Sequence, residues 1–96
     1  MASLRIHHEA DADYIEGYLW YYRQSPPAAD RFESGFQEAL DRIRKNPAWW
    51  AVYDETHRFV RIKDFPYHVI FRPEGDTIWV VAVAHDSRNP DYWRGR

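Results

Sequence analysis

Cysteine is absent from this chain of 96 residues. Without a thiol the chain has no disulfide bond, no thiolate zinc site and no cysteine nucleophile. The absence also suits a reducing compartment, so we expect the protein to act in the cytoplasm. Only four glycines occur, and none has the G-x-G-x-x-G or P-loop spacing that holds a nucleotide. We therefore expect no small-molecule cofactor.

Long apolar runs are missing as well. No stretch approaches the roughly 18 apolar residues that a membrane span needs, and the N-terminus lacks the basic segment and apolar run of a secretion signal. We expect neither export by that route nor membrane insertion. His7 and His8 are adjacent, so their side chains diverge on a strand, and no second ligand pair accompanies them. We expect no metal site.

An overall positive charge, the usual mark of a nucleic-acid-binding protein, is also lacking, because the formal net charge is −2. A local excess of positive charge exists between residues 58 and 72, which contain four basic residues and a single acidic one, Asp64. With 45% hydrophobic and 18% aromatic residues the composition is that of a globular protein. The length allows one domain, residues 1–96.

Apolar spacing predicts a short strand at residues 4–6 and then two helices. The first helix covers residues 9–24, and four apolar residues align on one of its faces: Ile15, Tyr18, Leu19 and Tyr22. Ser25 and Pro26 end this helix and begin the second, with Ser25 as its cap. The second helix ends at Asn46 and Pro47. The aromatic residues of the first helix are expected to serve packing.

Residues 48–57 show no clear period and are predicted to be a loop that Trp49 and Trp50 fix to the body. Three strands joined by short turns follow, at residues 59–62, 67–72 and 77–84. The predicted fold class is α+β. An N-terminal strand and a two-helix hairpin, packed on one face of a small sheet, precede a three-stranded antiparallel meander.

Strand alternation assigns the side chains to two faces. Four apolar residues are expected to point toward the helices: Val60, Ile62, Val69 and Phe71. Arg61, His68 and Arg72 then converge on the opposite face. The last strand is apolar on both faces, so the helices cover only half of it. Either the C-terminal tail, through Trp93, or a partner polypeptide is expected to cover the rest.

A cationic cluster with histidine and tyrosine is suited to cleaving RNA, because arginine stabilises the phosphate while histidine or tyrosine moves protons. Six residues supply these groups: Arg61, His68, Arg72, His85, Arg88 and Tyr92. The plainer interpretation is a set of solvated strand residues and a tail held by salt bridges. Both interpretations stay open.

Four segments together resemble the RelE/ParE superfamily of toxins, and more narrowly its ParE-like plasmid-stabilisation branch. They are I-H-H-E-A-x-A-D at residues 6–13, R-I-x-x-N-P at 42–47, R-x-x-x-F-P-Y-x-V-x-F-R at 61–72 and A-V-A-H-x-x-R-x-P-x-Y-W at 82–93. The resemblance implies a toxin of a type II toxin-antitoxin system. A cognate antitoxin polypeptide would neutralise it and contact Trp79, Val81, Val83, His85 and Trp93.

The resemblance also implies one of two targets, since RelE-like members cut mRNA on the ribosome and ParE-like members poison DNA gyrase without being nucleases. By position, Arg61 stands where the nucleases have a catalytic lysine and Tyr92 where they have a catalytic tyrosine. Arg88 lies near a tail arginine, and His68 replaces a strand arginine. This partial retention and the net charge favour a ParE-like toxin acting on gyrase. The alternative is a ribosome-dependent endoribonuclease using Arg61, His68, Arg72, Arg88 and Tyr92, and a member that has lost its toxicity is a third possibility.

Overall fold

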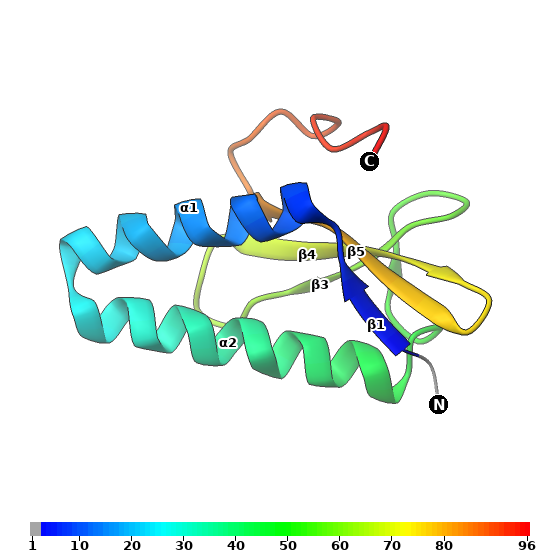
Figure 1. The fold of residues 1–96 in the computed structure, drawn as a ribbon, viewed down its shortest axis with the longest axis horizontal. Coiled ribbons are helices and arrows are strands. Elements are labelled where there is room, and N and C mark those ends of the chain that lie inside the picture. Colours follow the sequence, from blue (N-terminus) through cyan, green and yellow to red (C-terminus); the bar gives the residue numbers. More distant parts are fainter. Residues whose placement is uncertain (1–2) are drawn as a thin grey trace.

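The computed structural model describes residues 3–96 as a two-helix hairpin packed on a sheet, with an irregular C-terminal tail (Figure 1). The elements are β1 (Ser3–Ile6), α1 (His8–Gln24), α2 (Pro26–Lys45), β2 (Ala51–Val52), β3 (Arg58–Arg61), β4 (Tyr67–Glu74) and β5 (Thr77–His85). The predicted order of strand, two helices and meander is confirmed. Within residues 3–96 neither helix has the length and apolar character to cross a membrane.

The five strands form one mixed sheet in the order β1-β5-β4-β3-β2. β1 lies at one edge, parallel to β5, whereas the other neighbours are antiparallel. Strands β4 and β5 are joined by Gly75 and Asp76, and the positive φ of Gly75 (60°) is the geometry that glycine favours in such tight turns. The meander is therefore antiparallel, as the short turns predict.

Residues 48–57, predicted to be a loop, contain the short edge strand β2, in which Ala51 pairs with Phe59. Trp50 fixes this segment as expected, because its indole N–H donates to the Arg42 carbonyl oxygen over 3.1 Å. Trp49 does not, since 78% of its side chain is exposed. The two adjacent tryptophans therefore differ completely in environment, which their shared sequence context does not reveal.

Helix α1 approaches the core closely through small residues, and Tyr14, Tyr18 and Tyr21 pack partly buried beside them. Its buried residues are Ala10, Asp13 and Gly17. A Cβ at Gly17 would lie 3.1 Å from both Phe32 Cζ and the Tyr67 hydroxyl oxygen, so glycine permits this close approach. Of the four apolar residues that helical spacing aligns, Tyr18 packs against the core, whereas Ile15, Leu19 and Tyr22 are 43 to 51% exposed.

Helix α2 begins at Pro26 with Ser25 in the N-cap position, but the Ser25 side chain makes no capping hydrogen bond. The helix ends at Lys45, before Asn46 and Pro47, as predicted. Its apolar face is buried as expected, against the sheet residues predicted to point inward. This main core includes Phe32, Phe36, Leu40, Ile43, Val60, Ile62, Val69 and Phe71.

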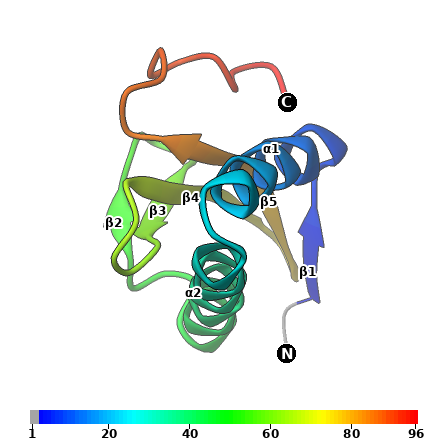
Figure 2. The same ribbon diagram turned by 90° about the vertical axis from the view of Figure 1, so that its left-hand side faces the viewer.

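A second, smaller core lies on the opposite face of the sheet, where the C-terminal tail covers β4 and β5. It consists of Ile70, Val81, Ala82, Ala84 and Trp93. Figure 2 shows the tail and α2 on opposite sides of the sheet. Of the two covers that the sequence leaves open, a tail or a partner polypeptide, the tail provides this one.

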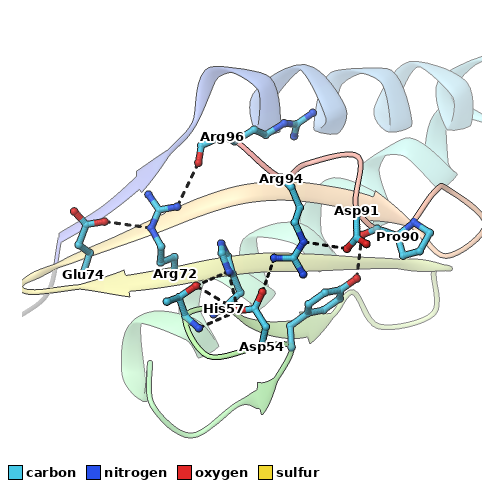
Figure 3. Close-up of polar contacts among 10 residues, drawn as sticks. Asp54, His57, Arg72, Glu74, Pro90, Asp91, Arg94 and Arg96 are labelled. Carbon is cyan, nitrogen blue, oxygen red and sulfur yellow. Dashed lines mark hydrogen bonds and ion pairs between the residues drawn. The ribbon is translucent and has the colours of Figure 1, made fainter.

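Polar contacts to the β2–β3 hairpin fix the tail in place (Figure 3). The Arg94 guanidinium donates to Asp54 over 2.6 Å, and the Tyr53 hydroxyl donates to the Pro90 carbonyl oxygen over 2.9 Å. Asp54 is itself held by His57, whose Nδ1 lies 3.0 Å from the carboxylate. Hydrogen bonds to charged groups are stronger than neutral ones, so this set orders a segment without regular secondary structure.

Candidate functional site

The predicted cationic face assembles only in part, around Asp86. Antiparallel pairing places Arg61 of β3 directly opposite His68 of β4. Asp86, just after β5, accepts two hydrogen bonds from Arg61, at 2.6 and 3.3 Å, and its carboxylate lies 3.1 Å from His68 Nδ1. The result is a small Arg–Asp–His cluster at the surface.

The electrostatics of this cluster follow from the ion pair. The hydrogen bonds from Arg61 hold the pKa of the Asp86 carboxyl below its usual value, and Asp86 in turn raises the pKa of Arg61. Both groups therefore stay charged at neutral pH and neutralise each other. In this structure the Arg61 guanidinium is therefore directed at Asp86, in an ion pair at the surface.

Arg72 lies apart from this cluster, against the sequence expectation that Arg61, His68 and Arg72 converge. It pairs with Trp79 on β5, four residues along β4 from His68. Its guanidinium donates to Glu74 over 3.2 Å and to the Arg96 carbonyl oxygen over 3.3 Å (Figure 3). Arg72 lies on the same face of β4 as His68, as predicted. It is four residues further along the strand, so it does not reach the Arg61–His68 pair.

Tyr92 and Arg88 meet each other, with the Arg88 guanidinium carbon 4.0 Å from the centre of the Tyr92 ring. The Tyr92 hydroxyl donates to Asp13 over 2.9 Å. Burial, and secondly this bond to Asp13, raises the pKa of Tyr92 far above that of free tyrosine. Tyr92 is therefore an internal hydrogen-bond donor in this structure, poorly placed to exchange protons with a bound substrate.

The residues expected to contact a partner fall on two faces of β5. A β-bulge explains the split, because Ile70 pairs with Ala82 and Phe71 pairs with Val80, which leaves Val81 as an extra residue. Val81 joins the core under the tail, with Trp79 packed against it, whereas Val83 joins the core under the helices. His85 contacts the Tyr67 ring.

Burial limits what a partner reaches on this strand. Val81, Val83 and Trp93 are at most 2% exposed, because the chain's own helices and tail cover them. Of the two covers expected for the outer face of β5, the C-terminal tail therefore occupies it in this structure. A partner reaches Val81 and Trp93 only if the tail moves away, and the role of these residues in partner binding stays a prediction.

An accessible apolar strip lies along the outer face of α1, and we call it the α1 outer strip: Ile15, Leu19 and Tyr22. These residues stand at positions i, i+4 and i+7, so they form one continuous line along the helix. Helical spacing in the sequence already aligns these three residues. Spacing alone does not show whether the face they form points to the core or to solvent. An accessible apolar strip is the kind of surface that partner polypeptides cover.

Comparison with known proteins gives concordant results. The model of a family described as the ParE toxin of the type II toxin-antitoxin system parDE matches residues 4–90. Toxin ParE2 of Mycobacterium tuberculosis, in strains CDC 1551 and H37Rv, is 29% identical over 89 residues, which is 92% of this chain and 85% of the relative.

A solved structure shares the fold. The chain is similar to a protein of a chromosomal ParDE system from P. aeruginosa, with a TM-score of 0.66 and 16% sequence identity, over 88% of this chain and 96% of that one. At this identity the likeness concerns the fold. The family match, by contrast, spans nearly the whole chain, from β1 into the tail. The chain therefore belongs to the ParE toxin family of type II toxin-antitoxin systems.

Proposed function

We propose that this ParE-family toxin acts in the cytoplasm as a non-enzymatic inhibitor of DNA gyrase and that a cognate antitoxin polypeptide neutralises it. Toxicity then depends on binding an essential protein rather than on cutting RNA. The antitoxin and the target are both partners of the folded toxin, so exposed surface, and not a catalytic pocket, carries the function.

The observation that carries this proposal is the state of Arg61 and Tyr92. Arg61 is paired with Asp86 through two hydrogen bonds, and the Tyr92 hydroxyl is directed into the protein at Asp13. A nuclease needs one free cation at the phosphate and one group that exchanges protons there. Neither position meets this need, which supports inhibition by binding. The net charge of −2 further disfavours docking on ribosomal RNA.

The α1 outer strip supports the antitoxin part of the proposal. Large apolar side chains that stay exposed in a chain of this size gain burial only when a second polypeptide covers them. An amphipathic helix or strand of an antitoxin is suited to such a line of residues. The tail face of the sheet is less suited, since the tail already covers it.

Two assays test the proposal. Purified toxin is added to DNA gyrase in a supercoiling assay, with an equal amount of toxin that has been bound to its antitoxin as the control. We expect free toxin to inhibit supercoiling and bound toxin to leave it unchanged. In parallel, RNA 5′ ends are mapped after induction of the toxin in a bacterial host. Growth arrest together with new 5′ ends at in-frame codon positions, and with unimpaired gyrase, would overturn the proposal.

A further inference from the structure

A hollow of about 490 Å³ lies between the second half of α1, the turn before β4 and the end of β5. It belongs neither to the Arg61 cluster nor to the α1 outer strip. Aromatic rings make up most of its wall. The residues around it are Glu16, Trp20, Tyr21, Pro66, Tyr67, His85 and Ser87.

Contacts among the rings hold this wall in place. Tyr67 meets His85 edge to face, with centroids 5.0 Å apart, and Trp20 meets Tyr21 in the same way at 5.1 Å. Tyr21 and Tyr67 link the two pairs at 6.2 Å. Such edge contacts fix ring orientation. Trp20 remains 52% exposed, so one aromatic wall is open to an incoming group.

Ser87 sets the hydrogen-bonding character of the imidazole. Its backbone N–H lies 3.0 Å from His85 Nδ1, and its hydroxyl oxygen lies 2.7 Å from the same nitrogen. Nδ1 therefore acts as an acceptor, and the neutral ring carries its proton on Nε2. In this tautomer the imidazole adds no positive charge to the wall.

Among the residues that line the hollow, Glu16 is the only one with a formal charge when His85 is neutral. Glu16 and Trp20 stand one helical turn apart, on the same side of α1. The nearby Arg88 does not neutralise this charge by entering the hollow, because its guanidinium stacks over Tyr92. An aromatic wall with one carboxylate attracts a cation by both cation–π and charge interactions.

We propose that this hollow is a receptor for an arginine side chain of a partner polypeptide, which is the antitoxin if the proposed function holds. Arginine fits better than lysine because its planar guanidinium stacks on rings while its N–H groups pair with a carboxylate. Its charge complements Glu16, and the rings of Trp20 and Tyr67 supply stacking surface. The α1 outer strip and this receptor would then lie on the same helix and bind one partner together.

The test uses the purified toxin and a defined probe, the peptide Ac-Gly-Gly-Arg-Gly-Gly-NH2. Binding is followed in NMR spectra through the backbone amide signals of Tyr21, Tyr67 and His85, which line the hollow. The control probe carries citrulline, which has nearly the same shape without the charge. We expect a saturable shift with the arginine peptide and affinity about tenfold weaker with the citrulline peptide, as loss of a cation–π and charge interaction implies.

Matched variants locate the effect. Glu16→Gln and Trp20→Ala are each expected to weaken binding by about tenfold. Glu55→Gln and Trp49→Ala remove the same groups from exposed positions elsewhere, and they should bind like the unmodified protein. Equal binding of the arginine and citrulline peptides, equal binding of a lysine peptide, or no saturable shift would each overturn the proposal.

The toxicity measurement separates this inference from the proposed function. The peptide assay needs neither gyrase nor antitoxin, whereas growth arrest after induction needs no peptide. Selective arginine binding without growth arrest would support the receptor and count against the proposed function. Growth arrest without arginine binding would do the opposite.

Discussion

Asp13 and Arg96, 83 positions apart in the chain, form an ion pair with both side chains at most 10% exposed. Arg96 Nη1 lies 2.7 Å from Asp13 Oδ2, and the same oxygen accepts hydrogen bonds from the Tyr92 hydroxyl and the Val83 N–H. One carboxylate of α1 thus joins β5 and the tail. The tail is therefore held in two places, at Arg96 by Asp13 and at Arg94 by Asp54.

Removing Asp13 should destabilise the protein strongly. Asp13→Ala removes the only buried carboxylate that pairs with the Arg96 guanidinium among residues 3–96, which costs about 3 to 5 kcal/mol of unfolding free energy. Urea unfolding measures the loss. Glu9→Ala is the control, because Glu9 also pairs with Arg96 at 3.1 Å but is mostly exposed, and its loss should cost about 1 kcal/mol or less. Similar losses for the two variants would contradict the buried role of Asp13.

Trp93 should account for much of the tail's contribution to stability. Trp93→Ala removes the largest side chain of the core under the tail, and such substitutions cost about 3 to 5 kcal/mol. Trp49→Ala removes the same side chain where it is exposed and should change stability by about 0.5 kcal/mol or less. Thermal unfolding of the two variants, with dye binding to report exposed apolar surface, checks the contrast. A Trp93→Ala variant as stable as Trp49→Ala would mean that the tail does not pack on the sheet in solution.

The predictable part of the fold is the part that follows from local spacing. Strand alternation correctly assigns Val60 and Val69 to the helix face, and Asn46 and Pro47 correctly mark the end of α2. Spacing also finds the apolar line of α1. It does not show that this line faces solvent, because the close packing of α1 depends on small residues such as Gly17 meeting Phe32, which are contacts between distant segments.

The site was less predictable for the same reason. Arg61 and His68 come together because their strands pair, which alternation anticipates. Asp86, which neutralises Arg61, follows β5 and has no spacing that marks it as a partner. The bulge at Val81 moves later residues of β5 to the other face, and a sequence of consecutive apolar residues contains no signal for its position.

Acid should weaken the attachment of the tail through Asp54. The Arg94 guanidinium, together with hydrogen bonds from Thr56 and His57, holds the pKa of Asp54 well below that of a free aspartate. A carboxyl whose folded-state pKa is depressed stabilises the fold above its unfolded-state value of about 3.9 and loses this contribution as pH falls through the lower folded-state value. Between about pH 4 and pH 2, unmodified protein should therefore lose more stability than Asp54→Asn. Parallel losses in the two proteins, measured by urea unfolding at each pH, would rule out this role.

Toxicity should survive loss of the two residues that a nuclease would need. Arg61 is already paired with Asp86 and the Tyr92 hydroxyl with Asp13, so Arg61→Ala and Tyr92→Phe should change stability but not target inhibition. We expect growth arrest by the double variant within about twofold of the unmodified toxin when both accumulate to equal levels, since under the proposed function neither group takes part in catalysis. Colony counts after induction, with protein quantified by immunoblot, provide the measurement. A folded double variant that no longer arrests growth would favour the endoribonuclease.

The α1 outer strip should bind the antitoxin through Leu19 at its centre. Leu19→Glu places a charge on an already exposed position, so the isolated toxin should lose about 0.5 kcal/mol or less of stability. In an apolar interface the same charge is desolvated, and the affinity of the complex should fall by about tenfold or more. Trp49→Glu is the matched control, because it adds the same charge at an exposed aromatic residue outside the strip. Titration calorimetry with the cognate antitoxin gives both affinities, and growth rescue by that antitoxin should fail for Leu19→Glu alone. Equal affinities for the two variants would place the antitoxin on another surface.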